Sequence, residues 1–174
     1  PLLSADQSVS CASCHDTNKG FSDGRGLSVG IAGRENSRSA PSLWNSAFVK
    51  QFFWDARANS LEEQALSPLF SLQEMGNNPT QLLDSLKAVE AYPRLFKQAF
   101  PNREQLTLDS IASALAAFQA SLISLNSRYD QYAHGYAEAL NAHELEGLNV
   151  FRSFVARCSQ CHMPPLFTNQ QIAV

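Results

Sequence analysis

The stretch SVSCASCHD, residues 8–16, contains the pattern Cys-x-x-Cys-His, with Cys11, Cys14 and His15 at its fixed positions. The same pattern returns near the other end of the sequence as RCSQCH, residues 157–162. All four cysteines of the 174-residue chain belong to these two motifs. In this pattern two thiols can add to the vinyl groups of one haem, and the adjacent histidine can supply an axial nitrogen to the iron. The two motifs therefore predict two covalently bound haems.

Three other uses of the cysteines are open on spacing alone: a zinc site built from all four thiols, two redox-active dithiols, and structural disulfides. A zinc site would require the two motifs to meet in space, and it leaves the histidine after each pair unexplained. A thioredoxin-like dithiol should follow a strand in a βαβ unit, and the sequence shows no such unit. We prefer haem attachment, with His15 and His162 as proximal ligands and with Cys158 and Cys161 attaching the second haem.

Composition and charge narrow the class of protein. Hydrophobic residues make up 44% of the chain and charged residues 17%, which is typical of a globular protein. The net charge of -3, without a lysine and arginine cluster, argues against a nucleic-acid partner. No run of apolar residues is long enough for a membrane span. Because haem c is attached outside the cytoplasm, we expect a periplasmic protein whose signal peptide has been removed.

The spacing of hydrophobic residues predicts a mainly helical chain. Residues 1–50 are rich in Gly, Ser, Asn and Arg, which favours loops. Ser60 begins a capping box that opens a short helix, and we expect this helix to end near Pro68 because proline lacks a backbone donor. A second helix is predicted over 81–90, with Thr80 as its cap.

The clearest helix is predicted over 107–125, where apolar side chains recur at spacings of three and four. Its buried face is expected to hold Ile111, Leu115, Phe118 and Leu122. Asn141 and Glu144 form another capping pattern, and the helix that they open is expected to run straight into Cys158. No segment alternates apolar and polar residues for long enough to form a strand, so the predicted fold class is all-α.

Four short stretches between the cysteine motifs carry a family resemblance. They are APSLWN (40–45), FFWDAR (52–57), LEEQAL (61–66) and QEMG (73–76). Together with the cysteine motifs and the segment that follows the second one, they make the chain resemble the bacterial dihaem cytochrome c peroxidases and the related MauG enzymes. The resemblance implies an all-α fold of two cytochrome c-like haem domains. We place the peroxidatic N-terminal domain at 1–128 and the start of the electron-transfer domain, incomplete in this chain, at 129–174.

In that family the N-terminal haem reacts with peroxide, the C-terminal haem stores and delivers electrons, and a tryptophan lies between them. The resemblance assigns these three places to the haem of His15, the haem of His162 and Trp54. Glu74 stands where the family has its distal acid–base carboxyl group; an apolar pocket disfavours the ionised form, which suits such a group to moving a proton between peroxide oxygens. Without the resemblance, Glu74 is an exposed loop carboxylate and Trp54 a core residue.

Gln64, Pro68 and Met75 match residues that line the same distal pocket. The resemblance implies that Gln64 orients peroxide or water, and that Pro68 and Met75 shape the cavity. Taken alone, Gln64 and Met75 are ordinary helix-surface or core residues. Arg57 is expected to bind a haem propionate through its guanidinium group, with a surface ion pair to an Asp or Glu as the alternative.

Two positions depart from the family pattern. Many members have a histidine after Ser-x-Gly, which occupies the sixth position of the N-terminal haem until the other haem is reduced. Here Ile31 follows Ser28-Val29-Gly30, and isoleucine cannot ligate iron, so we expect a haem that is open without reductive activation. Ser39 replaces an asparagine that usually binds calcium between the domains, which leaves calcium an open expectation.

The resemblance therefore implies an oxidoreductase that reduces hydrogen peroxide to water. Its electrons would come from a small redox protein, a cytochrome c or a cupredoxin, via the second haem. One alternative is a MauG-like enzyme that uses a high-valent haem to oxidise Trp or Tyr residues of a protein substrate. The other is a non-catalytic dihaem electron carrier. A homodimer is left open.

The remaining histidines, His134 and His143, lie in polar surroundings and are expected to be exposed to solvent. Met163 directly follows His162, so it cannot reach the opposite face of the same iron. The family's C-terminal domain continues well beyond its cysteine motif. We therefore expect the sequence from Pro1 to Val174 to be a fragment, whose second haem takes its sixth ligand from outside it.

Overall fold

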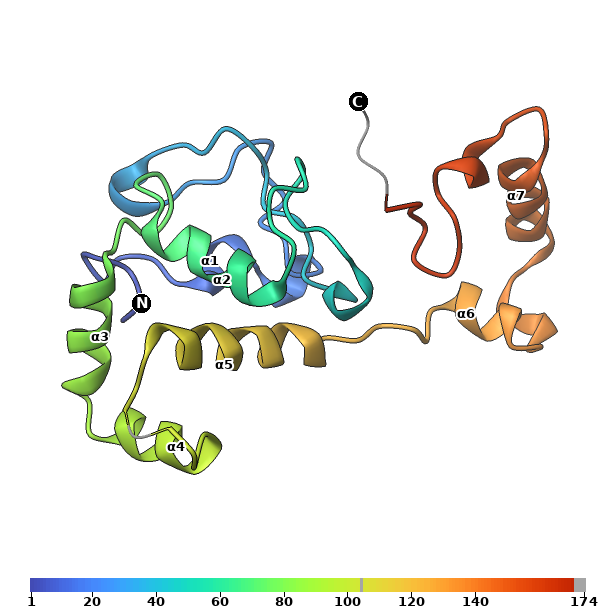
Figure 1. The fold of residues 1–174 in the computed structure, drawn as a ribbon. Helices are drawn as coiled ribbons and strands as arrows, with labels where there is room; N and C mark the ends of the chain where they lie inside the picture. The colour runs from blue at the N-terminus through green and yellow to red at the C-terminus, as the bar shows by residue number, and fades with distance from the viewer. Residues whose placement is uncertain (104, 171–174) are drawn as a thin grey trace. The chain divides into compact units, whose positions relative to one another are not determined.

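Capped helices joined by long loops build the chain, and the computed structural model describes residues 1–103 and 105–170 (Figure 1). Within these ranges no β-strand forms, and the only pairings of extended backbone are isolated bridges such as Asp16–Ser22. The prediction of an all-α fold is confirmed. The chain end at Val174 lies outside the described residues.

The chain divides into two compact units, Pro1–Leu122 and Ile123–Val174. Each unit contains one of the two cysteine motifs. The division falls slightly before the domain boundary that the sequence suggested between residues 128 and 129. The assignment of each unit as a haem domain stays a prediction.

The first fifty residues hold little regular helix, as the sequence predicted. Helix α1, Cys11–Cys14, is a single turn. Three short 3₁₀ turns follow it at Thr17–Lys19, Ile31–Gly33 and Ser46–Phe48. Extended loops connect these turns.

Helix α2, Leu61–Phe70, begins where the sequence predicted, because the side chain of Ser60 accepts the backbone N–H of Glu63 at 3.1 Å. The helix ends two residues after Pro68, close to the predicted end, and Pro68 lies in its last turn. Proline cannot donate to the preceding turn, but only one helical hydrogen bond is lost. A backbone N–H just beyond the helix still closes the last turn onto the carbonyl of Ser67 at 3.0 Å.

Helix α3, Pro79–Lys87, starts earlier than predicted. Its N-cap is Asn78, whose side chain accepts the backbone N–H of Gln81 at 3.0 Å, so the assignment of Thr80 as the cap is wrong. Pro79 occupies the first helical position, where a missing N–H costs nothing. Helix α4, Ala91–Ala99, was not predicted.

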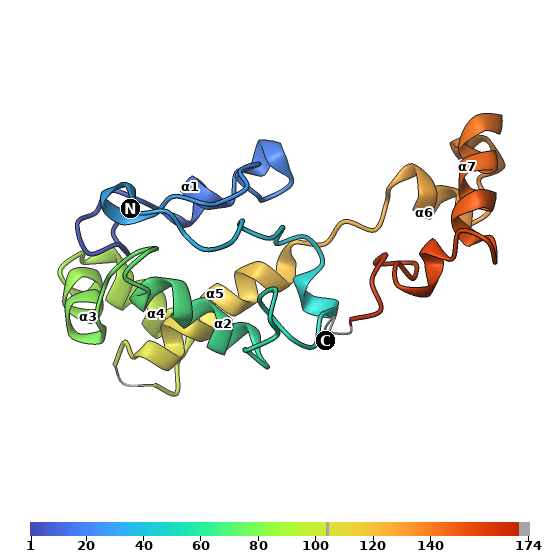
Figure 2. The ribbon, with the colours of Figure 1, turned by 90° about the horizontal axis from the view of Figure 1, so that it is seen from above.

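Helix α5, Leu108–Ser121, lies within the predicted range 107–125, but it ends before Leu125. Thr107, which was predicted as part of the helix, is its N-cap. It packs beside α2, as Figures 1 and 2 show. The buried face of α5 is lined mainly by small residues such as Ala112 and Ala116, which let the two backbones approach. Phe118, expected on this face, is 56% exposed, so its predicted burial is wrong.

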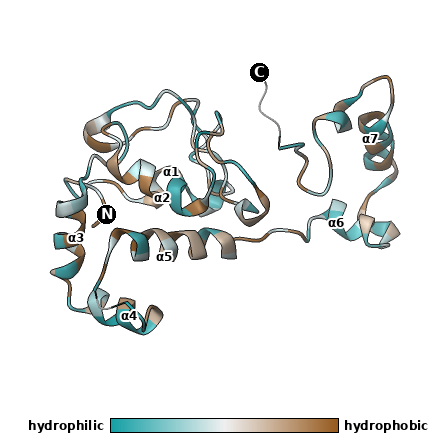
Figure 3. Ribbon diagram, viewed as in Figure 1, coloured by the Kyte–Doolittle hydropathy of each residue, from teal (hydrophilic) through white to brown (hydrophobic). Residues whose placement is uncertain are grey.

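The core of the first unit gathers residues from α2, α3, α5 and the loop after α2. Hydrophobic and hydrophilic positions alternate along α3, and its hydrophobic positions supply Leu82 and Leu86 to the core (Figure 3). The buried core residues are Leu69, Met75, Leu82, Leu86, Leu106 and Ile111. Because Met75 packs in this core, it anchors the loop that carries the neighbouring residue Glu74.

The second unit contains helix α6, Arg128–Ala133, which was not predicted, and helix α7, Ala142–Arg152. The capping box of Asn141 and Glu144 opens α7, as predicted. The expectation that this helix runs straight into Cys158 is wrong. Helix α7 ends at Arg152, and a turn over 153–157 leads to a 3₁₀ turn at Cys158–Gln160.

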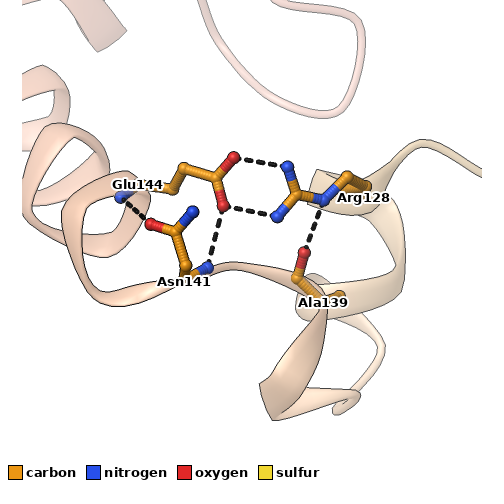
Figure 4. Close-up of polar contacts among 4 residues, drawn as sticks. All are labelled: Arg128, Ala139, Asn141 and Glu144. Atoms are coloured by element: carbon orange, nitrogen blue, oxygen red, sulfur yellow. Dashed lines mark hydrogen bonds and ion pairs between the residues drawn. The ribbon is translucent and has the colours of Figure 1, made fainter.

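One charged residue ties α6 to α7. The guanidinium group of Arg128 forms a two-pronged ion pair with Glu144 and donates a further hydrogen bond to the carbonyl of Ala139 at 2.9 Å (Figure 4). Glu144 also accepts the backbone N–H of Asn141 at 2.8 Å. The carboxylate thus serves as both helix cap and ion-pair partner.

Candidate functional site

The first cysteine motif folds as one closed helical turn. The backbone N–H of Ser10 donates to Oγ of Ser13 at 3.0 Å, and the N–H of His15 donates to the carbonyl of Cys11 at 2.8 Å. A spacing of three residues in a helix places Cys11 and Cys14 on the same face. Short-range contacts alone therefore bring two thiols and an imidazole together.

The ring of His15 is oriented by the backbone of the loop after it. Its Nδ1 lies 2.8 Å from the carbonyl oxygen of Phe21. A carbonyl can only accept, so Nδ1 carries the proton and Nε2 keeps its lone pair. Metal-bound histidines generally hold their second nitrogen in this way, which fixes the ring and raises its basicity. Nε2 of His15 is therefore prepared for a metal.

The second motif repeats this arrangement. The backbone N–H of His162 donates to the carbonyl of Cys158 at 2.9 Å, and Nδ1 of His162 lies 3.1 Å from the carbonyl oxygen of Phe167. All four cysteines carry free thiols, so none forms a disulfide. In the part of the chain that the structure describes, no three His, Cys, Asp or Glu side chains gather as metal ligands.

The loop that carries Glu74 folds back onto the end of α2. The backbone N–H of Met75 donates to the carbonyl of Pro68 at 3.1 Å, and the N–H of Gly76 donates to that of Ser71 at 2.8 Å. The side chain of Met75 is 6% exposed, in the core cluster. Its ordinary role as a core residue is thus observed, and its predicted role in shaping a pocket stays a prediction.

The segment after Ser28 brings the first motif and Glu74 together. The thiol of Cys14 donates to the carbonyl of Val29 at 3.8 Å, and the N–H of Ile31 donates to the carbonyl of Glu74 at 2.7 Å. Partial burial raises the pKa of the Cys14 thiol, and the carboxylates of Asp23 and Glu74 act in the same direction. Residues 29–31 therefore connect the turn of the first motif to the peptide of Glu74.

Gln64 carries an unusual polar atom. It lies half-buried on α2, and its Oε1 is buried without a hydrogen-bond partner among the described residues. Leaving a buried acceptor unpaired is unfavourable, so such an atom is suited to a hydrogen-bond donor from a ligand. This agrees with a residue that orients peroxide or water. Pro68 is half-buried on the same helix.

Trp54 is no core residue, since it is 62% exposed. Its indole N–H donates to the carbonyl of Ser39 at 3.0 Å. Calcium binding near Ser39 stays a prediction. Arg57 donates to Asp55 at 2.8 Å, and its guanidinium carbon lies 3.5 Å from the centre of the Phe53 ring. The surface ion pair is therefore observed for Arg57, and its propionate role stays a prediction.

Asp55 joins two arginines. Arg38 contacts it at 2.7 Å and Arg57 at 2.8 Å. The hydrogen bond from Arg38, followed by that from Arg57, lowers the pKa of Asp55 to about 2. Asp55 follows Trp54 directly in the sequence, and neither Asp55 nor Arg38 was singled out from the sequence. His134 and His143 are exposed, as predicted.

Three functional features escaped sequence reasoning. Phe21 and Phe167 act through their carbonyl oxygens, for which the side chain leaves no signal. Gly30 was noted only as part of a motif, although it lies against the Glu74 loop.

No helix among residues 1–103 and 105–170 has the length and apolar character needed to cross a lipid bilayer.

Comparison with known proteins places this arrangement among haem enzymes. A family model described as di-haem cytochrome c peroxidase matches residues 1–138. The methylamine utilization protein MauG of Methylorubrum extorquens is 37% identical over 169 residues, covering 97% of this chain and 48% of the relative. The cytochrome c551 peroxidase of Nitrosomonas europaea is 34% identical over 165 residues, covering 95% of this chain and 48% of the relative. The chain thus spans about half the length of the curated relatives that it matches.

Solved structures give the same answer for the fold. A MauG-like protein associated with microbial copper homeostasis superposes with a TM-score of 0.88 at 32% identity, covering 99% of this chain and 52% of that one. The diheme peroxidase BthA of Burkholderia thailandensis superposes with a TM-score of 0.82 at 27% identity, covering 98% of this chain and 48% of that one.

Proposed function

Because the chain belongs to the dihaem cytochrome c peroxidase family, we propose that it carries two covalently attached haems and works in the reduction of hydrogen peroxide to water. The observation that carries this proposal is the closed turn of α1 with the ring of His15 held through Nδ1 by Phe21. That geometry presents two thiols and one free imidazole nitrogen, which are the protein ligands of a haem c. Cys158, Cys161 and His162 repeat it for the second haem.

The residues around the first motif divide the work on peroxide. The haem, when bound, supplies an iron that can exchange electrons with peroxide. Glu74 accepts a proton from one peroxide oxygen and returns it to the other as the bond between them breaks. Gln64 offers its unpaired Oε1 to a peroxide hydrogen. Two electrons and two protons complete the conversion of one peroxide to two waters.

The second motif and Trp54 serve the electron supply in this proposal. Cys158, Cys161 and His162 would hold a haem that could take up electrons from a cytochrome c or a cupredoxin and supply them to the peroxide-reactive site. Trp54 is suited to a place on this route because its large indole is exposed rather than packed in the core. The periplasm is the compartment in which covalent haem and such donors occur together, and we place the protein there.

Ile31 decides the resting state of the site. Its hydrocarbon side chain has no donor atom for iron, so nothing at this position blocks the sixth coordination place of the first haem. The site is therefore ready for peroxide without prior reduction of the second haem.

The same residue favours a second candidate, a MauG-like enzyme that oxidises Trp or Tyr residues of a protein substrate. Such an enzyme also needs an open first haem, and a MauG protein is among the relatives. The rate of turnover with each electron donor distinguishes the peroxidase from the MauG-like enzyme. Rapid peroxide-dependent oxidation of a reduced cytochrome c favours the peroxidase, and slow turnover with oxidation of a partner protein favours the MauG type.

Electron paramagnetic resonance of the ferric haem-loaded protein, combined with stopped-flow mixing with hydrogen peroxide, tests the proposal. We expect a high-spin signal from the first haem and a spectral change on mixing. Two low-spin, six-coordinate haems that do not respond to peroxide would instead identify a non-catalytic electron carrier.

A further inference from the structure

Gly30 makes the closest backbone approach in the neighbourhood of Glu74. A Cβ atom added at Gly30 would lie 2.0 Å from the carbonyl oxygen of Gln73, 2.6 Å from that of Glu74 and 2.7 Å from the Cα of Glu74. These distances lie below any ordinary contact, and all three atoms belong to the backbone. The φ of Gly30 is -103°, which any residue can adopt. Space, and not backbone conformation, therefore demands glycine here.

The neighbours of Gly30 strengthen this contact. The N–H of Ile31 donates to the carbonyl of Glu74 at 2.7 Å, and the Ile31 side chain is 8% exposed. A Cβ added at Gly76 would lie 3.3 Å from both Cδ1 and Cγ2 of Ile31, so this side chain covers Gly76 closely. Further along, Nη1 of Arg34 donates to the carbonyl of Leu72 at 2.7 Å. Residues 30–34 thus hold the loop over 72–76 along its length.

The same segment also touches the haem-attachment turn. The carbonyl oxygen of Val29, directly before Gly30, lies 3.8 Å from Sγ of Cys14. Residues 29–31 therefore contact the attachment turn on one side and the Glu74 peptide on the other. The position of Glu74 relative to the first motif depends on how closely this segment can approach.

We propose that Gly30 is a positioning residue for Glu74. Because it has no side chain, residues 29–31 dock onto the peptide between Gln73 and Glu74 and set the place of the Glu74 carboxyl group beside the attachment turn. The proposal rests on the proposed function, in which Glu74 moves the proton during peroxide cleavage. It adds that Ile31, besides leaving the iron open, is part of the contact that holds this carboxyl group in place.

The test compares Gly30→Ala in two backgrounds of the haem-loaded protein, one with Glu74 and one with Glu74→Gln. With Glu74 present we expect the second-order rate constant with hydrogen peroxide to fall about 100-fold, the typical effect of a misplacement of about 1 Å. In the Glu74→Gln background we expect less than about a two-fold further loss, because the two residues act as a unit. Gly26→Ala is the matched control, since no heavy atom lies within 4 Å of its added Cβ.

Equal losses in both backgrounds, or no loss with Glu74 present, would overturn the proposal. Should Gly30→Ala not fold, Ile31→Ala removes the cover of Gly76 without adding atoms, and we expect a smaller loss with the same dependence on Glu74. Hydrogen exchange gives a readout independent of peroxide: the Ile31 amide and residues 72–77 should exchange faster in Gly30→Ala, with α5 unchanged. Unchanged exchange at these amides would likewise overturn the docking.

Failure of the proposed function gives a different pattern. If the unsubstituted protein does not react with peroxide, or if Glu74→Gln reacts normally, the peroxidase role of Glu74 is wrong. The exchange measurement still reports in that case whether Gly30 holds the Glu74 loop.

Discussion

At the level of single residues, the rings of His15 and His162 are oriented in the same way. Each ring points Nδ1 at the carbonyl of a phenylalanine further along the chain, Phe21 at 2.8 Å and Phe167 at 3.1 Å. This contact requires only a loop that brings a backbone carbonyl back to the ring. The phenylalanine side chains take no part in it, so the sequence does not indicate it. The surroundings of the first motif also include the peptide of Glu74, which residues 29–31 connect to Cys14.

Glu74→Gln is the most direct residue-level test. We expect the rate constant with hydrogen peroxide to fall about 10²- to 10⁴-fold, the usual contribution of general acid–base catalysis, because the amide cannot accept and return the proton. Stopped-flow absorbance of the haem measures it. Glu62→Gln, an exposed carboxylate on α2, should leave the rate unchanged. A normal rate in Glu74→Gln would assign the proton transfer to another group.

Asp55 allows a prediction about pH. Its pKa is lowered to about 2 from an ordinary value of 3.8, chiefly by Arg38 and then by Arg57. Since the folded pKa is the lower one, the ion pairs stabilise the folded state above pH 3.8, and this stabilisation is lost as the pH falls through about 2. Arg38→Gln should raise the pKa of Asp55 toward its ordinary value, and Arg57→Gln should raise it less.

Carbon-detected NMR titration of the Asp55 carboxyl group measures this pKa. Arg25→Gln provides the control, because Arg25 interacts with Asp23 and not with Asp55. A pKa of Asp55 that is the same in Arg38→Gln as in the parent protein would contradict the assignment of the ion pairs.

At the level of elements, helix α2 makes two sets of contacts. Helix α2 packs on α5, and its C-terminal carbonyls receive the loop that carries Glu74. Pro68 takes part through its carbonyl, which accepts the N–H of Met75 at 3.1 Å. The element that supports the core thus also supports the candidate catalytic residue.

The N-cap of α3 provides an element-level prediction. Asn78→Ala should lower the free energy of unfolding by about 1 kcal/mol, the typical value of a lost N-cap, because its side chain satisfies the N–H of Gln81. Thr80→Ala, at the position that the sequence suggested as the cap, should change it by less than about 0.5 kcal/mol. Urea unfolding followed by circular dichroism distinguishes the two. A larger loss for Thr80→Ala would restore the cap suggested by the sequence.

Each of the two units contains one complete attachment motif, which is the main feature at the level of the whole molecule. Large apolar side chains are exposed in both units. Examples are Leu72 at 63% in the first unit and Val155 at 93% in the second. Such side chains are available for contact with a bound group or with another polypeptide.

Haem content tests this division. The pair of substitutions Cys11→Ser and Cys14→Ser should remove one of two haems per chain and abolish reaction with peroxide. The pair Cys158→Ser and Cys161→Ser should remove the other haem and chiefly slow electron delivery. Haem per protein, from the alkaline pyridine spectrum, measures the first effect. An unchanged haem content in either variant would contradict covalent attachment at that motif.

The sequence by itself determined the features that depend on neighbours three or four residues apart. These are the two Cys-x-x-Cys-His motifs, the caps at Ser60 and Asn141, and the all-α class. The motif is a pattern of five consecutive residues, and a cap is a contact within one turn. Thr80 misled because Asn78 offers a better placed acceptor at the start of α3.

Only the tertiary structure decided how distant segments meet. The approach of Gly30 to the Gln73–Glu74 peptide, the link from Cys14 through Val29 to Ile31, and the placing of Met75 in the core join residues from different parts of the chain. No local pattern encodes such contacts, because they depend on where whole loops come to rest against α2. The position of Glu74 beside the first motif is therefore a property of the folded chain.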